Sequence, residues 1–430
     1  MRIHLKTLGC RLNEAELETW ARQFQAEGHQ IINNAADADL IVLNSCAVTH
    51  DAVRKSKQLI RRTHRQSPNA KLLVSGCYAS LNPEEAKAAL GVDLVVTNRD
   101  KGRLVEIAKE ILDMPTMPEL ASEPGEASLF ALGRQRAFVK VQDGCRYRCT
   151  FCIVTLARGE ENSRGIVEIV DEINALHLEG IQEAILTGVH LGGWGSDLGL
   201  RLEDLISAVL DNTDIPRLRL GSLEPWELSD KFFVLLQNPR LMPHLHLPLQ
   251  SGSDAVLRRM ARRCKTAEFA HLATLARLAC PDINITTDII VGFPGETEAE
   301  WEESLYFIGG MGFGHIHLFG FSAREGTKAA NLPDQVSAPV AKSRAKQLHE
   351  LASEHKRANL ARFLGREFRV LWEGGSEPQA DGKRTFPGYT PNYLRVETCV
   401  GPGIELCRGI ASARLIGMAA SGDCLCAEMV

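Results

Sequence analysis

The sequence has no long hydrophobic run, although hydrophobic residues make up 44% of its 430 residues. No stretch approaches the ~18 consecutive apolar residues that a membrane-spanning helix needs. The first few residues mix basic side chains into an apolar stretch and lack the uninterrupted core of a secretory signal. We therefore expect a cytoplasmic protein with no membrane partner.

Internal repeats and low-complexity tracts are absent too. A large charge of one sign is also lacking, and the formal net charge of −5 gives no global attraction for nucleic acid. Three local basic clusters lie at residues 54–65, 258–265 and 342–362. Each is most simply a solvated helix face, although together they would suit a polyanion. Charge alone leaves that choice open.

The chain is long enough for two or three domains. Alternating strand and helix patterns predict an α/β domain with a parallel sheet at residues 1–112. Residues 113–133 are rich in proline and predict a linker. Residues 134–364 carry six strand patterns and predict a partial (β/α)6 barrel that ends in a charged helix. Residues 365–430 have short alternating runs broken by glycine and proline, which predict a small β-barrel. The six strand patterns are at residues 138–141, 183–186, 218–222, 244–249, 283–290 and 315–319.

Three of the twelve cysteines form a C-x3-C-x2-C loop, at Cys145, Cys149 and Cys152. In a cytoplasmic protein such thiols indicate metal ligands rather than disulfides. Structural zinc sites close with four ligands, whereas three thiolates suit a [4Fe-4S] cluster with one iron left open. The alternative is a structural metal site or a group of buried thiols.

A second set of cysteines follows three predicted strands of the amino-terminal domain. Cys10, Cys46 and Cys77 come shortly after the strands predicted at residues 3–7, 40–44 and 71–75. The carboxyl ends of parallel strands meet at one edge of a sheet, so we expect the three thiols to lie together. Three ordinary buried cysteines are the alternative. The shared position after successive strands favours a second [4Fe-4S] cluster, again with one open iron.

Several motifs resemble the radical S-adenosylmethionine (SAM) methylthiotransferases over essentially the whole chain. The similar segments are residues 7–13, 44–49, 75–77, 142–145, 157–159, 222–225, 247–253 and 288–296. Three local segments, at residues 53–58, 187–192 and 388–396, are most similar to the enzymes that act on N6-threonylcarbamoyladenosine in tRNA. The relatives that modify isopentenyladenosine in tRNA, or an aspartate of a ribosomal protein, fit less well. Asn162 and the pair Thr155-Leu156 depart from the family pattern in the loop after the cysteines.

The resemblance implies transfer of a methylthio group to C2 of the modified adenosine at position 37, next to the anticodon. The C2 hydrogen is too weakly acidic for a positioned base, so the reaction needs a cofactor that starts radical chemistry. The family assigns reductive cleavage of SAM to a cluster on Cys145, Cys149 and Cys152, which are the catalytic residues. It assigns the sulfur to a cluster on Cys10, Cys46 and Cys77, and the methyl group to a second SAM.

A set of residues near predicted strand ends is expected to bind SAM. The candidates are Phe151, Thr187, Gly188, Ser222, Glu224, Gln250 and Asp288. Glycine at a strand end lets the backbone approach a ligand, and the polar side chains suit the ribose or the carboxylate. Each is alternatively a turn glycine or a satisfied polar group. The histidines of the core fit strand positions that line the barrel, and no role is assigned to them.

The carboxy-terminal barrel resembles the RNA-binding TRAM domain. Its expected RNA-binding residues interleave charge with aromatic rings: Lys383, Arg384, Tyr389, Tyr393 and Arg395. A protein-binding tail is the alternative. The implied partners are tRNA, an electron donor and a sulfur source, and we expect a monomer. A non-catalytic iron-sulfur carrier or RNA scaffold is the interpretation outside this class, and two sets of three cysteines argue against it because simple carriers use four per cluster.

Overall fold

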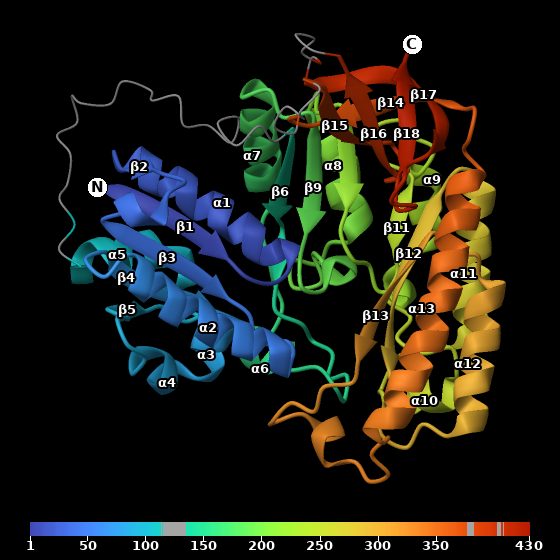
Figure 1. The fold of residues 1–430 in the computed structure, drawn as a ribbon, viewed down its shortest axis with the longest axis horizontal. Helices are drawn as coiled ribbons and strands as arrows, with labels where there is room; N and C mark the ends of the chain where they lie inside the picture. The colour runs from blue at the N-terminus through green and yellow to red at the C-terminus, as the bar shows by residue number, and fades with distance from the viewer. Residues whose placement is uncertain (113, 115–134, 376–381, 402–405, 407) are drawn as a thin grey trace.

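The computed structural model describes residues 1–112, 114, 135–375, 382–401, 406 and 408–430. The linker predicted at residues 113–133 falls almost entirely outside these ranges. Among the described residues, none of the helices has the length and apolar character that a membrane span requires. Figure 1 shows an amino-terminal α/β domain, a central core of parallel strands and a small carboxy-terminal barrel that closes one end of that core.

The amino-terminal domain is a five-stranded parallel sheet in the order β2-β1-β3-β4-β5. Its strands are β1 (Arg2–Thr7), β2 (Gln30–Ile31), β3 (Leu40–Ser45), β4 (Lys71–Gly76) and β5 (Leu94–Val95). Its helices are α1 (Arg11–Ala26), α2 (His50–Gln66), α3 (Cys77–Leu81), α4 (Pro83–Lys87) and α5 (Leu104–Leu112). Every residue of β3 is buried, as expected for a strand with helices on both faces. The predicted parallel sheet is confirmed.

Some boundaries differ from the sequence-based expectation. The sequence pattern predicts a first helix from about Glu14, yet α1 begins at Arg11 because Cys10 takes the extended conformation of an N-cap. Asn82 followed by Pro83 predicts the start of another helix, with Gly91 closing it, yet α4 begins at Pro83 and ends at Lys87. The two-residue strand β2 is too short to leave an alternating pattern.

The core contains the six predicted strands as two three-stranded parallel sheets, β10-β9-β6 and β11-β12-β13. Parallel bridges Leu218↔Leu241 and Ser222↔His246 join the two sheets into one open arc. The strands are β6 (Arg136–Lys140), β9 (Glu183–Thr187), β10 (Arg217–Leu220), β11 (His244–His246), β12 (Asn284–Val291) and β13 (His315–Gly320). A two-stranded hairpin, β7 (Gln142–Asp143) and β8 (Asn162–Ser163), precedes and follows the C-x3-C-x2-C loop. The partial (β/α)6 barrel is thereby confirmed.

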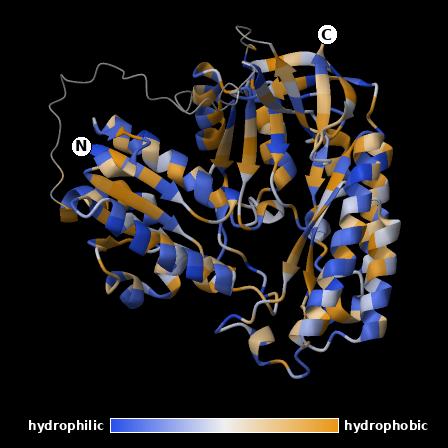
Figure 2. Ribbon diagram, in the orientation of Figure 1, coloured by the Kyte–Doolittle hydropathy of each residue, from blue (hydrophilic) through white to orange (hydrophobic). Residues whose placement is uncertain are grey.

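Helices cover the outer face of this arc. They are α7 (Ile166–Leu178), α8 (Leu202–Asn212), α9 (Asp230–Leu235), α10 (Asp254–Arg259), α11 (Thr266–Ala279), α12 (Glu298–Gly310) and α13 (Ala338–Ala361). The short helix α6 (Val154–Arg158) packs instead on α3 of the amino-terminal domain. Apolar side chains from these helices and from the strands form one continuous buried cluster that includes Leu205, Phe269 and Trp301. Figure 2 shows apolar strands behind helices that alternate polar and apolar residues, as amphipathic surface helices do.

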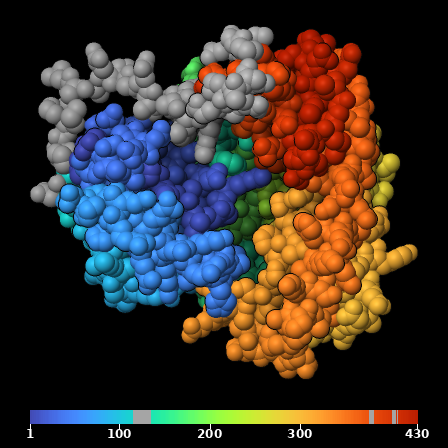
Figure 3. Space-filling model, in the orientation of Figure 1, coloured from blue at the N-terminus to red at the C-terminus, as the bar shows by residue number. Residues whose placement is uncertain are grey.

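The carboxy-terminal residues form a closed barrel in the order β14-β15-β16-β18-β17. The strands are β14 (Glu367–Trp372), β15 (Arg384–Tyr389), β16 (Arg395–Val400), β17 (Gly409–Met418) and β18 (Leu425–Met429). Its interior includes Trp372, Val396 and Leu415, and it packs on Leu360 and Phe363 at the end of α13. The predicted small β-barrel is confirmed. Figure 3 shows it seated directly against the core and close to the amino-terminal domain.

Candidate active site

The C-x3-C-x2-C loop is fixed by backbone contacts on both sides. The Cys145 N–H donates to the carbonyl of Gly159 at 3.1 Å, and the Cys152 N–H donates to the carbonyl of Cys149 at 3.0 Å. Gly144 has a φ of +70°, and a Cβ there would lie 1.8 Å from the Glu160 carbonyl oxygen. Glycine is therefore required at the entrance to the loop.

The donor set of this loop fits a [4Fe-4S] cluster. Cys145, Cys149 and Cys152 are free thiols, and the thiols that interact with Cys145 are those of the other two. Burial raises the pKa of Cys145 to about 12 and that of Cys152 to about 11, so the thiolate forms need positive charge nearby. A metal cluster supplies that charge, and Arg262 Nη1 adds to it 3.8 Å from Cys149 Sγ. Three thiolates leave one iron open for SAM.

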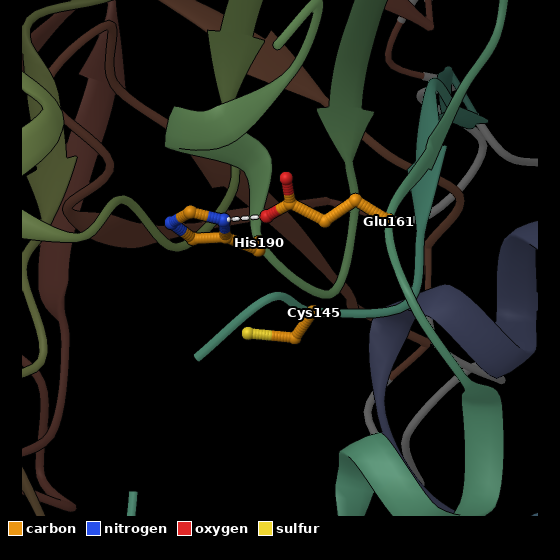
Figure 4. Close-up of side chains that lie close together, drawn as sticks. All are labelled: Cys145, Glu161 and His190. Carbon is orange, nitrogen blue, oxygen red and sulfur yellow. Dashed lines mark hydrogen bonds and ion pairs between the residues drawn. The ribbon is translucent and has the colours of Figure 1, made fainter. Parts of the chain in front are cut away.

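His190 and three carboxylates lie beside Cys145 of the loop. In Figure 4, the Cys145 side chain lies near His190, whose Nδ1 pairs with a carboxylate oxygen of Glu161. His190 Nε2 lies 3.4 Å from Glu227 and 3.9 Å from Glu224. Burial lowers the pKa of His190, but the three carboxylates raise it by more, so the pKa lies above its ordinary value.

Glu224 offers an open acceptor beside the loop. Its Oε2 is buried and has no hydrogen-bond partner among the described residues. Burial raises the pKa of Glu224, and its charge also raises the pKa of the nearby Cys145. A buried acceptor without a donor is costly unless a ligand satisfies it. The ammonium or ribose hydroxyls of SAM are donors of that kind, so this site fits the cofactor that the family implies.

The second cysteine set is brought together as the strand positions predict. Cys10 precedes α1, Cys46 follows β3 and Cys77 begins α3, and the thiol of Cys46 interacts with both of the others. Gly9 allows this convergence, because a Cβ there would lie 3.0 Å from Cys46 Cβ. Cys46 and Cys77 are buried while Cys10 is exposed. Three free thiols at one exposed sheet edge fit a second cluster with an open iron, and we call them the thiol triad.

A buried charge network links the thiol triad to the C-x3-C-x2-C loop. Arg158 Nη1 lies 2.8 Å from Glu16 and 3.1 Å from Asp143, and Lys101 Nζ is 2.6 Å from both carboxylates. Lys140 Nζ completes it, 2.7 Å from Asp143. Burial opposes ionisation, but the three cations together hold the pKa values of Glu16 and Asp143 well below their ordinary range.

Arg158 carries this network's positive charge to the thiol triad. Its Nη2 donates to Asn13 Oδ1 at 2.7 Å, next to Cys10, and its charge lowers the pKa of both Cys10 and Cys46 against the rise caused by burial. The sequence motif at residues 157–159 includes Arg158 but predicts no role for its side chain. Nothing in its local sequence indicates that residues over a hundred positions away neutralise it.

A cavity of about 880 Å³ lies between the domains. The thiol triad lines one side, and Thr187, Gly188, Ser222 and Asp288 line it from strands of the core. Tyr393 and Arg395 reach it from the carboxy-terminal barrel. Four of the seven predicted SAM contacts therefore face the same cavity as the predicted sulfur-donating cysteines.

The other predicted SAM contacts are placed differently. Phe151 packs in an apolar cluster with Met260 and Phe293. Gln250 is buried with a φ of 80°, a strained backbone of the kind found at functional sites. Gly188 has a packing reason for its missing side chain, because a Cβ there would lie 2.9 Å from Oε1 of Gln142. That amide in turn donates to the carbonyl of Gly144 at the start of the loop.

The predicted RNA-binding tyrosines lie at the junction of the barrel with the core. Tyr389 and Tyr393 stack at 5.0 Å, and the Arg136 guanidinium lies 4.1 Å from the Tyr389 ring centroid. Tyr393 also contacts His244 at 4.8 Å and has a φ of 66°. Of the predicted basic residues, Lys383 and Arg384 are outside the cavity lining, whereas Arg395 is exposed within it.

Histidines to which the sequence assigns no role line the cavity wall. They are His244, His246, His315 and His317. His246 Nε2 lies 3.2 Å from Asp288 Oδ1, and its Nδ1 lies 2.9 Å from the Thr286 hydroxyl. Burial lowers the pKa of His315 to about 4 and also lowers that of His317. The wall is therefore polar, and these two rings are neutral at pH 7.

Comparison with known proteins identifies two family matches and several close relatives. Residues 2–97 match the family described as uncharacterized protein family UPF0004, and residues 139–308 match the radical SAM superfamily. The chain is 35% identical to threonylcarbamoyladenosine tRNA methylthiotransferase MtaB of Thermotoga maritima, over 86% of each chain. It is also 35% identical to tRNA-2-methylthio-N(6)-dimethylallyladenosine synthase of Cereibacter sphaeroides, over 93% of this chain and 97% of that protein.

A solved structure shares the fold at low identity. The radical S-adenosylmethionine methyltransferase TsrM of Kitasatospora setae, with a tryptophan substrate and a SAM analog bound, superposes with a TM-score of 0.55. The match covers 74% of this chain and 72% of that chain at 15% sequence identity. This similarity shows a shared fold.

Proposed function

The chain belongs to the tRNA methylthiotransferases of the radical SAM superfamily, and we propose that it modifies N6-threonylcarbamoyladenosine in tRNA. The product is the 2-methylthio derivative of that nucleoside at position 37, next to the anticodon. The enzyme is a transferase that uses SAM and two [4Fe-4S] clusters.

One observation carries the proposal: the thiol triad and the strand ends beside the C-x3-C-x2-C loop face a single cavity. A methylthiotransferase must bring a sulfur source and a SAM-derived radical to the same carbon. About 880 Å³ lies within the volume range of ligand pockets, which suits one flipped nucleotide.

The bound clusters supply an electron for SAM cleavage, at Cys145, Cys149 and Cys152, and the transferred sulfur, at Cys10, Cys46 and Cys77. The protein's own residues orient the reactants. Glu224 accepts a hydrogen bond from SAM. Cys46 and Cys77 are buried and the three loop cysteines are half-buried, which limits the access of water and oxygen to the reacting atoms.

The charge network fixes the distance between the two sites. Glu16 and Lys101 belong to the amino-terminal domain, whereas Lys140, Asp143 and Arg158 belong to the core. These ion pairs hold α1 against β6 and place Arg158 between the thiol triad and the loop. Docking of the two domains therefore sets the position of the sulfur source relative to SAM.

The tRNA backbone is proposed to follow helix α2. Asp51 pairs with Arg54 and Lys55, and Glu85 pairs with Lys57. The remaining basic residues of this helix, which we call the α2 arginines, are exposed and have no ion pair among the described residues: Arg61, Arg62 and Arg65. Unpaired cations on an exposed helix suit contacts to phosphate. Lys383, Arg384 and Arg395 on the barrel are proposed to extend this surface, while Tyr389 fixes the barrel in place.

Other parts of the reaction come from outside the chain. Each turnover consumes electrons and sulfur, so we expect a one-electron donor and a sulfur source as partners. We also propose that the enzyme works as a monomer in the cytoplasm, where its tRNA substrate is found.

A second candidate substrate is dimethylallyladenosine (isopentenyladenosine) in tRNA, because a relative named for that reaction is as similar as the one named for threonylcarbamoyladenosine. Mass spectrometry of total tRNA nucleosides from a strain that lacks the gene separates the two. We expect loss of the 2-methylthio derivative of N6-threonylcarbamoyladenosine and accumulation of its parent. Loss of the dimethylallyl counterpart alone would assign the second substrate. If no tRNA nucleoside changed, the substrate to test next would be an aspartate of a ribosomal protein.

A complementation control connects that phenotype to the site. The wild-type gene restores the modified nucleoside, and a Cys77→Ala gene expressed at the same level does not. Anaerobic SAM cleavage by the purified, reduced protein then excludes a non-catalytic iron-sulfur carrier, which would leave SAM intact.

A further inference from the structure

Arg11 occupies a particular place in the cavity. It is the first residue of α1, directly after Cys10 of the thiol triad, and it is exposed to the cavity that it lines. Its Nη2 donates to the Tyr393 hydroxyl at 3.0 Å, and its guanidinium carbon lies 5.4 Å from the Tyr393 ring centroid. The tyrosine holds the planar group in one orientation and leaves most of its N–H donors unused.

The acids of the cavity wall leave Arg11 without an ion pair. Asp288 lies 3.2 Å from His246, and Asp423 lies 2.6 Å from Lys356. Glu14, one turn along α1, forms no ion pair with Arg11 or with any other described residue. The positive charge of Arg11 acts on two histidines of the cavity wall. Burial is the main reason that the pKa values of His244 and His317 are lowered, and the charge of Arg11 lowers them further.

A cation held in this way suits a carboxylate. Arginine presents parallel N–H donors that match the two oxygens of a carboxylate, and the pair is stronger than a hydrogen bond between neutral groups. The threonylcarbamoyl group carries one carboxylate, whereas the dimethylallyl group is a hydrocarbon. A site built around a hydrogen-bonding group rejects an analogue that lacks it, because the site's own polar groups are then left unpaired.

We propose that Arg11 binds the carboxylate of the substrate's threonylcarbamoyl group and thereby selects this nucleoside; the inference rests on the proposed function. The position is productive because C2 and the N6 substituent of adenine both lie on its Watson–Crick edge. A residue that holds the substituent beside Cys10 also brings C2 toward the thiol triad. Tyr393, from the barrel, is a positioning residue for Arg11.

The test uses reconstituted holoenzyme and synthetic anticodon stem-loops. One RNA carries N6-threonylcarbamoyladenosine, and the other carries its methyl ester, which removes the charge and keeps the shape. The wild type should prefer the acid by about 10- to 150-fold in kcat/KM, the range expected for hydrogen bonds to a charged group. Arg11→Gln should lose that factor on the acid and change less than about threefold on the ester. Dissociation constants measured with SAM but without reductant should show the same pattern. Arg11→Gln should weaken binding of the acid and leave binding of the ester nearly unchanged.

Matched variants separate selection from a structural role. Arg395→Gln removes the other cavity cation that lacks an ion pair among the described residues, and Arg99→Gln removes an exposed arginine outside the cavity. Both should keep the preference for the acid. Arg11→Lys should keep part of it, because the charge remains while the pair of parallel donors is gone. Iron content and uncoupled SAM cleavage report whether each variant is folded.

Three results would overturn the inference. One is an equal loss on acid and ester in Arg11→Gln, and another is a loss of preference in Arg395→Gln alone. A wild type that treats acid and ester alike would overturn it even if Arg11→Gln failed to fold. Failure of the proposed function looks different: the wild type would then act on the dimethylallyladenosine stem-loop and on neither of the two test RNAs.

Discussion

Replacement of Glu16 by glutamine tests the charge network most directly. Glu16 is 3% exposed and is one of two carboxylates among three buried or half-buried cations. Lys101 and Arg158 lie 2.6 and 2.8 Å from it, and Lys140 lies at 3.2 Å. Glutamine keeps the size of the side chain and can keep the hydrogen bond from Asn44, but its NH2 group then replaces the oxygen that faces the three cations.

The expected cost follows from charge balance. Loss of one partner from a buried ion pair costs about 3–5 kcal/mol, because the remaining charge stays buried without compensation. Here Asp143 remains within 2.7 Å of two of the three cations, which favours the lower end, about 3 kcal/mol. The urea midpoint should fall by about 1 M for a protein with an m-value near 3 kcal/mol per M.

The pH dependence provides a second check with a defined sign. Burial raises the pKa of Glu16, but the three cations outweigh it and hold that pKa well below its ordinary range. A depressed carboxyl pKa stabilises the fold above the unfolded-state value of about 4.3, and the stabilisation is lost as the pH falls. The gap between wild type and Glu16→Gln should therefore be constant above about pH 5 and shrink by about 1.8 kcal/mol at pH 3.

Urea denaturation followed by circular dichroism, at several pH values, measures both effects. Glu14→Gln is the matched control, because Glu14 lies on the same helix, is half-buried and forms no ion pair among the described residues. It should change the free energy of unfolding by about 0.5 kcal/mol or less. A cost below about 1 kcal/mol for Glu16→Gln, or a gap at pH 3 as large as the gap at pH 7, would refute the network as the link between the domains.

Three further predictions concern the clusters and the RNA. Cys145→Ala should abolish SAM cleavage, whereas Cys77→Ala should keep the formation of 5′-deoxyadenosine and lose the methylthiolated product; equal behaviour would mean that the two sets do not have separate roles. Glutamine at the α2 arginines should weaken tRNA binding about tenfold and should reduce the slope of log affinity against log salt concentration by about 0.7–0.9 for each phosphate that is no longer neutralised, as a filter-binding titration would show. Gly144→Ala should lose most of its bound iron, because its Cβ would lie 1.8 Å from a carbonyl oxygen. Gly165→Ala, where φ is −67° and no atom lies within 4 Å, should keep it, and similar iron contents would contradict the steric explanation.

The cysteines of the site were predictable because their positions follow from simple rules. The C-x3-C-x2-C loop is local, so its spacing alone indicates three ligands. Cys10, Cys46 and Cys77 are far apart in sequence, but each follows a parallel strand, and the geometry of a parallel sheet brings such positions to one edge. The strands themselves carry strong signals, since β3 is buried on both faces and reads as a continuous apolar run.

The polar parts of the site were not predictable in the same way. Arg158 pairs with Glu16, and the two are separated by 142 positions with no shared pattern. The stacked pair Tyr389 and Tyr393 has the composition of an RNA-binding surface, and only the fold reveals that Arg136 covers one of the rings. Pairing of side chains across domain interfaces depends on docking, and a single sequence holds no periodic signal for it.

The carboxy-terminal barrel is a wall of the active site as well as a candidate RNA-binding module. Arg136, at the start of β6, lies 2.9 Å from Glu373 of the barrel and contacts Tyr389, so the barrel is tied to the strand that leads into the C-x3-C-x2-C loop. Tyr393 then reaches across to Arg11, beside the thiol triad. Because residues from three domains must meet before the substituent can be held, the cavity's selectivity depends on domain docking. A weakened Arg136–Glu373 ion pair should therefore reduce discrimination between acid and ester more than it reduces SAM cleavage, and an equal reduction of both would show that the barrel supports the core rather than the substrate.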